Sequence, residues 1–184
     1  MRRKRWTIVA LASVVVVHIH GTARALDRVS GTLTRTFTIV DDTELVGDVI
    51  CDVTAAPCFS FGVSDVELRL NGFSITGKAD PITGCNGAAF AGEMGIVTNG
   101  ARNVVVRGPG LVQRFRADGI FVTGSTSVRI ELVTASTNCM SGIRVAANSC
   151  GTIVQGNVAV RTARVKPACR AAAYESSDTI AGSG

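Results

Sequence analysis

The chain has 184 residues, of which 46% are hydrophobic, 18% are charged and 5% are aromatic, and its formal net charge is +5. A chain of this length suits one domain and is too short for a two-domain enzyme. The charged fraction is too low, and the apolar fraction too high, for a disordered protein. A charge of +5 raises the question of nucleic-acid binding, so the position of the positive charges has to be settled first.

The N-terminal segment, residues 1–25, has the pattern of a secretory signal peptide. Residues 2–5 are all basic, an apolar run follows from Trp6 to about Ile19, and Ala23 and Ala25 are the small residues at −3 and −1 from the expected cleavage site. The apolar run is shorter than the roughly 20 residues that a membrane-spanning helix needs. We therefore expect residues 1–25 to form a signal helix that is removed on export, with a retained membrane anchor as the alternative. The mature protein is then secreted or periplasmic and has no membrane partner.

Removal of this segment changes the charge balance. Five of the 19 basic residues and both histidines lie within residues 1–25, which leaves 14 basic residues against 14 acidic ones and a net charge of zero. A mature chain without histidine excludes Ser-His-Asp and Cys-His catalysis, and it excludes a His-ligated zinc or copper site. An exported chain without net charge is also a poor partner for nucleic acid.

The cysteines lie in the exported part of the chain. An even number in an oxidising compartment predicts disulfides, whereas a cysteine metal cluster would favour a Cys-x-x-Cys pair, which is absent. Cys51 and Cys58 are close enough in sequence to close a local loop. The spacing leaves the other pairings open, and metal binding or free thiols are the alternatives. The six candidates are Cys51, Cys58, Cys85, Cys139, Cys150 and Cys169.

The middle of the chain is self-similar. A glycine precedes an apolar pair or triplet at Gly95, Gly119 and Gly142, and short runs with period-two alternation begin at Val104, Val128 and Thr152. Both series advance in steps of about 24 residues, an interval within the range of known structural repeats, and we call it the repeat step. No helical period is sustained between residues 26 and 162. A unit of short strands and tight turns at this period indicates a stacked repeat, in which each unit buries its apolar face on the next.

Stacking the alternating runs by the repeat step predicts which side chains share a column. Val104, Val128 and Thr152 form one inward column, and a second column contains Val106, Ile130 and Val154. An outward column contains Arg107, Glu131 and Gln155, so we expect Arg107 and Glu131 to pair. Asn138 and Asn157 either form amide ladders or are ordinary turn residues. We expect at least one of Phe115 and Phe121 to lie in the core.

Three segments carry a resemblance to a known family. Residues 66–77 read VELRLNGFSITG, and similar patterns recur at residues 103–106 and 118–122. The chain resembles secreted right-handed parallel β-helix proteins of the pectate-lyase-like superfamily over about residues 30–162. The resemblance implies an all-β fold, a right-handed parallel β-helix (solenoid) of about four to five short rungs in a domain at residues 26–162. It places the first strands at residues 36–50 and the first turn at residues 51–61.

Two segments interrupt this pattern. Residues 78–94 are expected to form a projecting loop, which lines the binding face or covers the amino-terminal end of the helix. Residues 163–184 are polar and small, and we expect an irregular C-terminal tail without a further rung. The tail either caps an open strand edge or indicates that the chain is a truncated or frameshifted fragment of a longer protein.

Catalysis by this chain is not expected. Lyases of the resembled superfamily use an Arg base with acidic Ca²⁺ ligands, and its hydrolases use clustered Asp residues. Between residues 101 and 162 the only acidic residues are Asp118 and Glu131, and with Arg107 they are the catalytic candidates. Asp118 has the alternative of a turn residue that bonds its own backbone. We predict no metal and no cofactor; Ca²⁺ applies only if the protein is a lyase.

The charges favour a binding role. Residues 26–100 carry a net charge of −6 and residues 101–184 carry +6. Outward arginines on stacked strands match carboxylate and sulfate groups, whereas a merely solvated face is the alternative. We predict an exported module for noncatalytic binding of acidic polysaccharide or a cell-surface glycan, or for surface adhesion. A polysaccharide lyase or pectinase-like enzyme fragment that lacks its catalytic rungs is the alternative. The oligomeric state is left open, and the candidate binding residues are Arg107, Arg114, Arg116, Arg129 and Arg144.

Overall fold

The computed structural model describes residues 25–79, 85, 92–146, 148–160, 164–165 and 179–181. Within these residues all regular secondary structure is β-strand, and no helix occurs. The predicted signal helix lies outside the described residues, as does most of the projecting loop. The strands are β1 (Leu26–Leu33), β2 (Phe37–Ile39), β3 (Asp42–Cys51), β4 (Phe59–Phe61), β5 (Glu67–Arg69), β6 (Ser74–Thr76), β7 (Ile96–Val97), β8 (Val105–Gln113), β9 (Ile120–Val122), β10 (Arg129–Ser136), β11 (Ile143–Val145), β12 (Ile153–Gln155), β13 (Val158–Val160), β14 (Arg164–Val165) and β15 (Thr179–Ala181).

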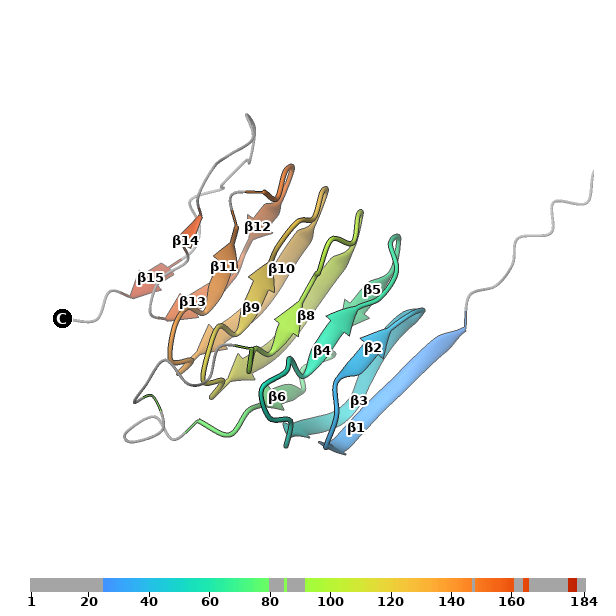
Figure 1. The fold of residues 1–184 in the computed structure, drawn as a ribbon, viewed down its shortest axis with the longest axis vertical. Helices are drawn as coiled ribbons and strands as arrows, with labels where there is room; N and C mark the ends of the chain where they lie inside the picture. The colour runs from blue at the N-terminus through green and yellow to red at the C-terminus, as the bar shows by residue number, and fades with distance from the viewer. Residues whose placement is uncertain are drawn as a thin grey trace, which may run out of the picture.

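The strands form two parallel sheets. In the first, here called sheet A, the order is β1-β3-β5-β8-β10-β13-β15, with β6 paired to β3 and β8, and β12 paired to β10. In the second, sheet B, the order is β14-β11-β9-β7-β4-β2. Neighbouring strands in each sheet come from successive passes of the chain, which therefore crosses repeatedly from one sheet to the other. Figure 1 shows these passes side by side, from β1 at one end to β14 and β15 at the other.

The strand register confirms the columns predicted from the repeat step. Ile130 of β10 pairs with Val106 of β8 and with Val154 of β12. Each of these side chains is at most 4% exposed. The other inward column, Val104, Val128 and Thr152, is equally buried, with at most 3% exposure. Alternation with period two thus directs one face of each strand into a continuous apolar core.

Close approach of successive passes explains the recurring glycine before the sheet B strands β7, β9 and β11. A Cβ atom on Gly95 would lie 2.4 Å from the carbonyl oxygen of Gly119. A Cβ atom on Gly119 would lie 2.7 Å from the carbonyl oxygen of Gly142. Both distances are too short for a real side chain, so the glycine column is a packing requirement of the stack.

Two buried asparagines bond to the backbone of the preceding pass. Asn138 accepts from the backbone N–H of Phe115 at 3.0 Å and donates to the carbonyl of Val112 at 3.2 Å. Asn157 accepts from Val133 and donates to Ile130, both at 2.8 Å. These bonds satisfy backbone groups at bends, where the sheet ladder is interrupted. Asn138 and Asn157 therefore act as turn residues, which was one of the two predicted alternatives. They do not form a ladder of amides bonded to one another.

The structure contains strands that the alternation did not indicate. The first strand, β1, precedes residues 36–50, where the first strands were expected. Its pattern is obscured because Asp27 occupies an inward register position beside Thr43, and because Gly31 lies at a bulge with a φ of +83°. In the tail, expected to be irregular, β14 joins β11 and β15 joins β13.

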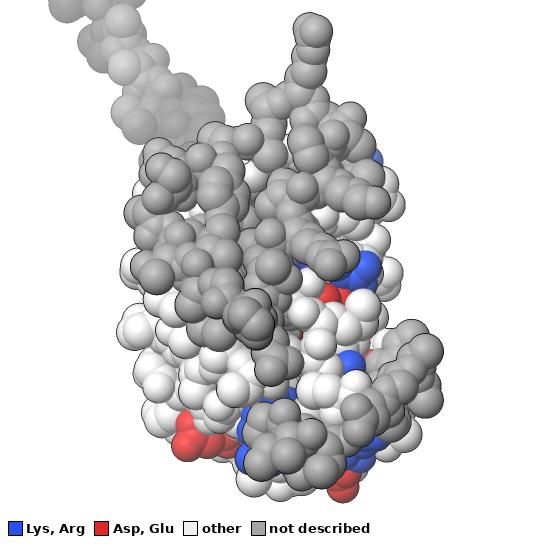
Figure 2. Space-filling model, turned by 90° about the vertical axis from the view of Figure 1, so that its left-hand side faces the viewer, with Lys and Arg blue, Asp and Glu red and all other residues white. Residues whose placement is uncertain are grey.

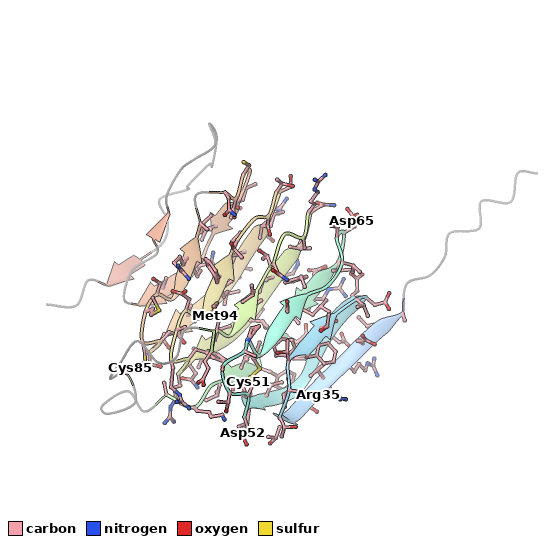
Figure 3. All side chains as sticks on the ribbon, in the orientation of Figure 1. Arg35, Cys51, Asp52, Asp65, Cys85 and Met94 are labelled. Carbon is pink, nitrogen blue, oxygen red and sulfur yellow. A yellow bond between two sulfur atoms is a disulfide. The ribbon has the colours of Figure 1, made fainter. Side chains whose placement is uncertain are left out.

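Disulfides connect several turns. Cys51 bonds to Cys58, the local loop that their spacing suggested, and Cys85 bonds to Cys139 at a sequence separation of 54. Cys150 is also disulfide-bonded, while Cys169 lies outside the described residues. In the view of Figure 3, the labelled Cys51 and Cys85 both lie toward the lower edge of the sheets. These bonds are consistent with an extracellular environment. Among the described residues there is no helix long and apolar enough to cross a membrane.

Candidate functional site

The outer face of sheet A carries a row of polar and charged side chains at one register position. Strand pairing aligns Arg28 with Glu44, Glu44 with Arg69, Arg69 with Arg107, Arg107 with Glu131, and Glu131 with Gln155. These residues belong to β1, β3, β5, β8, β10 and β12 and make up what we call the charged row. Parallel strands place successive members roughly 4.8 Å apart.

Glu67 and Glu131 link Arg69 and Arg107 of this row, together with Arg129, into one network. The carboxylate of Glu67 accepts from Arg69 at 3.0 Å and also from Arg107. Nη1 of Arg107 donates to Oε2 of Glu131 at 2.7 Å, and Nε of Arg129 donates to Oε1 of the same residue at 2.7 Å. The predicted pair of Arg107 and Glu131 is therefore present, and it belongs to a larger set that includes Glu67, Arg69 and Arg129.

The two kinds of side chain in the network differ in exposure. The glutamate side chains are 17% exposed at Glu67 and 10% at Glu131. The arginine side chains are 40% exposed at Arg69, 43% at Arg107 and 49% at Arg129. The carboxylates therefore act as anchors beneath the guanidinium groups, which remain accessible to a ligand. Each anchored guanidinium has lost much of its side-chain freedom before any ligand arrives.

This environment changes the pKa of Glu67. Partial burial opposes ionisation of its carboxyl group, but hydrogen bonds and charges from Arg107 and Arg69 outweigh burial and lower the pKa. The carboxylate is therefore ionised at neutral pH and remains a partner of both arginines.

An open depression of about 390 Å³ adjoins the network and is lined by Arg129, Glu131, Leu132, Gln155 and Gly156. Leu132 is 58% exposed and has a φ of +58°, a backbone conformation that residues other than glycine rarely adopt. Gly156 holds the corresponding place one pass later and also has a positive φ, of +64°. Figure 2 views the molecule from the end that carries β14 and β15, and it shows basic and acidic side chains next to one another there.

The remaining predicted arginines lie away from this row. Arg114 donates from Nε to the carbonyl of Ala79 at 3.0 Å, and Arg116 lies 2.9 Å from the carboxylate of Glu93. Arg144 belongs to sheet B, where its Nε donates to Oδ2 of Asp118 at 2.7 Å. The structure thus brings together only Arg107 and Arg129 of the five predicted binding residues.

The catalytic candidates are also separated. Glu131 and Arg107 share the charged row, whereas Asp118 lies two residues before the start of the sheet B strand β9 and is fully buried. Its Oδ1 accepts from the backbone N–H of Ser141 in the next pass and not from its own turn. Burial raises the pKa of Asp118, an effect that Arg144 and Ser141 oppose. Among the described residues, no group of three or more His, Cys, Asp or Glu is placed to hold a metal ion.

Sequence reasoning missed Glu67 and Arg69 as members of the site. Both stand at alternate positions in the segment VELRL, a signal that they share one face of a strand. The interval from Val66 to Val104 is longer than the repeat step, so the regular repeat did not align Glu67 with Arg107. Strand pairing across the longer connection sets this register.

Comparisons of the chain with family models, with curated proteins and with solved structures found no match.

Proposed function

We propose that this protein is an exported right-handed parallel β-helix module of the pectate-lyase-like type, and that it binds acidic polysaccharide without catalysis on the outer face of sheet A. The fold proposal is supported by parallel pairing of successive passes, which follows the repeat step from β8 to β10 and from β10 to β12. It is also supported by the alternation of the chain between two sheets. Export is supported by the signal-like segment at residues 1–25 and by the disulfides.

The observation that carries the binding proposal is the exposure of the anchored arginines. Arg69, Arg107 and Arg129 occupy three neighbouring strands, and each has 40–49% of its side chain exposed. A guanidinium group has five N–H donors, so each of these arginines retains donors beyond its contacts with Glu67 and Glu131, and these donors match a carboxylate or sulfate of a ligand. A polymer with regularly spaced anionic groups would engage several of these forks at once, which raises its affinity above that of a single unit.

The depression beside Arg129 supports a sugar as the ligand. Its volume of about 390 Å³ is within the range of roughly 300–1,000 Å³ common for ligand pockets. Its lining combines a cation, a carboxylate, an amide side chain and the apolar surface of Leu132. A uronic acid offers the complementary set, namely a carboxylate, hydroxyl groups and an apolar C–H surface.

The test is a binding titration of the purified protein with polygalacturonate, a sulfated glycan and a neutral glucan. We expect binding of the anionic polymers that weakens with added salt, because the contacts are ionic. The double variant R107Q/R129Q should weaken binding at least about tenfold, since it removes charge-assisted hydrogen bonds. The matched control is R102Q, because Arg102 is exposed but lies outside the charged row. No binding to any of these polymers, or equal binding by the double variant, would overturn the proposal.

The alternative of a lyase fragment meets an obstacle at Arg107. A lyase base must lose a proton, but the hydrogen bond and the charge of Glu67 raise the pKa of Arg107 above its already high value. The same ion pairing suits a permanently charged binding residue. Formation of unsaturated products from polygalacturonate with added Ca²⁺, measured by ultraviolet absorbance, would favour the lyase over the noncatalytic module.

A further inference from the structure

We propose that Arg144 is the centre of a second oxyanion site, on the outer face of sheet B, which takes a carboxylate or sulfate group. This site does not depend on the binding proposed for sheet A, because the described bonds of Arg144 do not involve the charged row.

Two contacts fix the position of the Arg144 side chain. Its Nε donates to Oδ2 of Asp118 at 2.7 Å, and its Cζ atom lies 3.7 Å from the centroid of the Phe121 ring. Phe121 and Arg144 are register neighbours on β9 and β11. A cation above an aromatic ring is attracted to the face of the ring, so the ring supports the guanidinium group from one side.

The anchor is itself rigid. Asp118 is fully buried, and its second oxygen, Oδ1, accepts from the backbone N–H of Ser141 at 3.2 Å. Both carboxylate oxygens therefore have fixed partners on the adjacent pass of the chain. A guanidinium group bonded to such a carboxylate loses little further side-chain entropy when it binds a ligand.

The terminal nitrogens of Arg144 are available to a ligand. The side chain is 33% exposed, and within the described part of the chain its hydrogen bonding is confined to Nε. The edge formed by Nη1 and Nη2 can accept a planar carboxylate or two sulfate oxygens in a bidentate contact. On the next strand, β14, the backbone of Arg164 holds the register position beside Arg144.

The test monitors the side-chain Nε–Hε signal of Arg144 by NMR in the full protein. Sodium sulfate, galacturonate and the methyl ester of galacturonate are titrated separately, because they separate a free inorganic anion, a sugar carboxylate and its uncharged analogue. We expect saturable shifts with sulfate and galacturonate and none with the ester. We also expect these shifts to persist in the R107Q/R129Q variant, which separates this site from the one on sheet A.

Variants sharpen the test. R144K keeps the charge but loses both the fork and the Nε–Hε signal, so its titration is followed at the backbone amides of residues 118, 121 and 144. We expect affinity to fall at least about tenfold. F121L keeps an apolar side chain without the ring, and a loss of about twofold to fivefold is expected from the missing cation–π contact. R102K is the control, because Arg102 is exposed and lies in neither proposed site, and it should leave the titration unchanged. The proposal is overturned if no shift saturates, if the ester is as effective as the acid, or if folded R144K binds as well as the wild type.

Discussion

Arg107 of β8 and Glu131 of β10 are direct register neighbours, and Nη1 of Arg107 donates to Oε2 of Glu131 at 2.7 Å. The two residues differ in exposure, with 43% of the arginine side chain accessible and only 10% of the glutamate side chain. The pair is therefore intermediate between a solvent-exposed salt bridge and a fully buried one. Its stabilising effect is reduced by solvent on the arginine side.

A double-mutant cycle of R107Q and E131Q measures this pair. We expect a coupling free energy of about 0.2–1 kcal/mol, toward the upper end because the carboxylate is largely buried. Urea unfolding of the wild type, both single variants and the double variant gives the value. A coupling indistinguishable from zero would show that the pair adds no stability, contrary to the expectation.

Acid should weaken the fold through Glu67. The native pKa of this group is lowered from 4.5, so its ionised form stabilises the folded state at pH values above 4.5. That contribution is lost as the pH falls from 4.5 through the lowered native pKa. E67Q should therefore be less stable than the wild type at pH 7, with a difference that shrinks on acidification. Urea unfolding between pH 7 and pH 3 checks this, and a difference independent of pH would contradict it.

Variants of Leu132 test whether its strained backbone lowers stability while its side chain contributes to binding. L132G should relieve a positive φ that costs about 1 kcal/mol, partly offset by the greater freedom of glycine in the unfolded chain. We expect its free energy of unfolding to equal or slightly exceed that of the wild type. L132A keeps the strain and is the matched comparison, so it should be less stable than L132G. Both variants should bind polygalacturonate more weakly, and a clear loss of stability in L132G would refute the argument from strain.

Asn138 should be far more important for stability than a surface asparagine. N138A leaves the backbone N–H of Phe115 and the carbonyl of Val112 without their partners, and we expect a loss of about 3 kcal/mol. In the control, N148A, the lost bond is an exposed one to the backbone N–H of Gly124, which water replaces. Thermal and urea unfolding compare the two variants. Similar small losses in both would contradict the structural role of Asn138.

The N-terminal segment predicts the mass of the exported protein. We expect cleavage after Ala25, which would leave a chain that begins at Leu26, and mass spectrometry of the secreted protein measures this directly. A23R should block cleavage because the position at −3 requires a small residue. Recovery of the wild type with residues 1–25 still attached would instead favour a membrane anchor.

Much of the core could be predicted from the sequence because its pattern is local. Alternation within a strand and a constant repeat step together align Val106, Ile130 and Val154, and strand pairing confirms that column. The same rule failed at β1, where Asp27 and Gly31 break the alternation, and in the short strands of the tail. A strand of two or three residues has too few positions to display a period.

The arrangement of the charges depended on the tertiary structure. The sequence by itself determined that outward arginines occur on the later strands, that Arg107 and Glu131 are neighbours, and that the charge of +5 comes from residues 1–25. It did not determine that Glu67 bonds Arg107 across the lengthened connection, nor that Asp118 holds Arg144 on the opposite sheet. The physical reason is that a repeat fixes only the register between passes of equal length. Where the connection lengthens, or where partners approach through a bend, backbone pairing in three dimensions decides which charges meet.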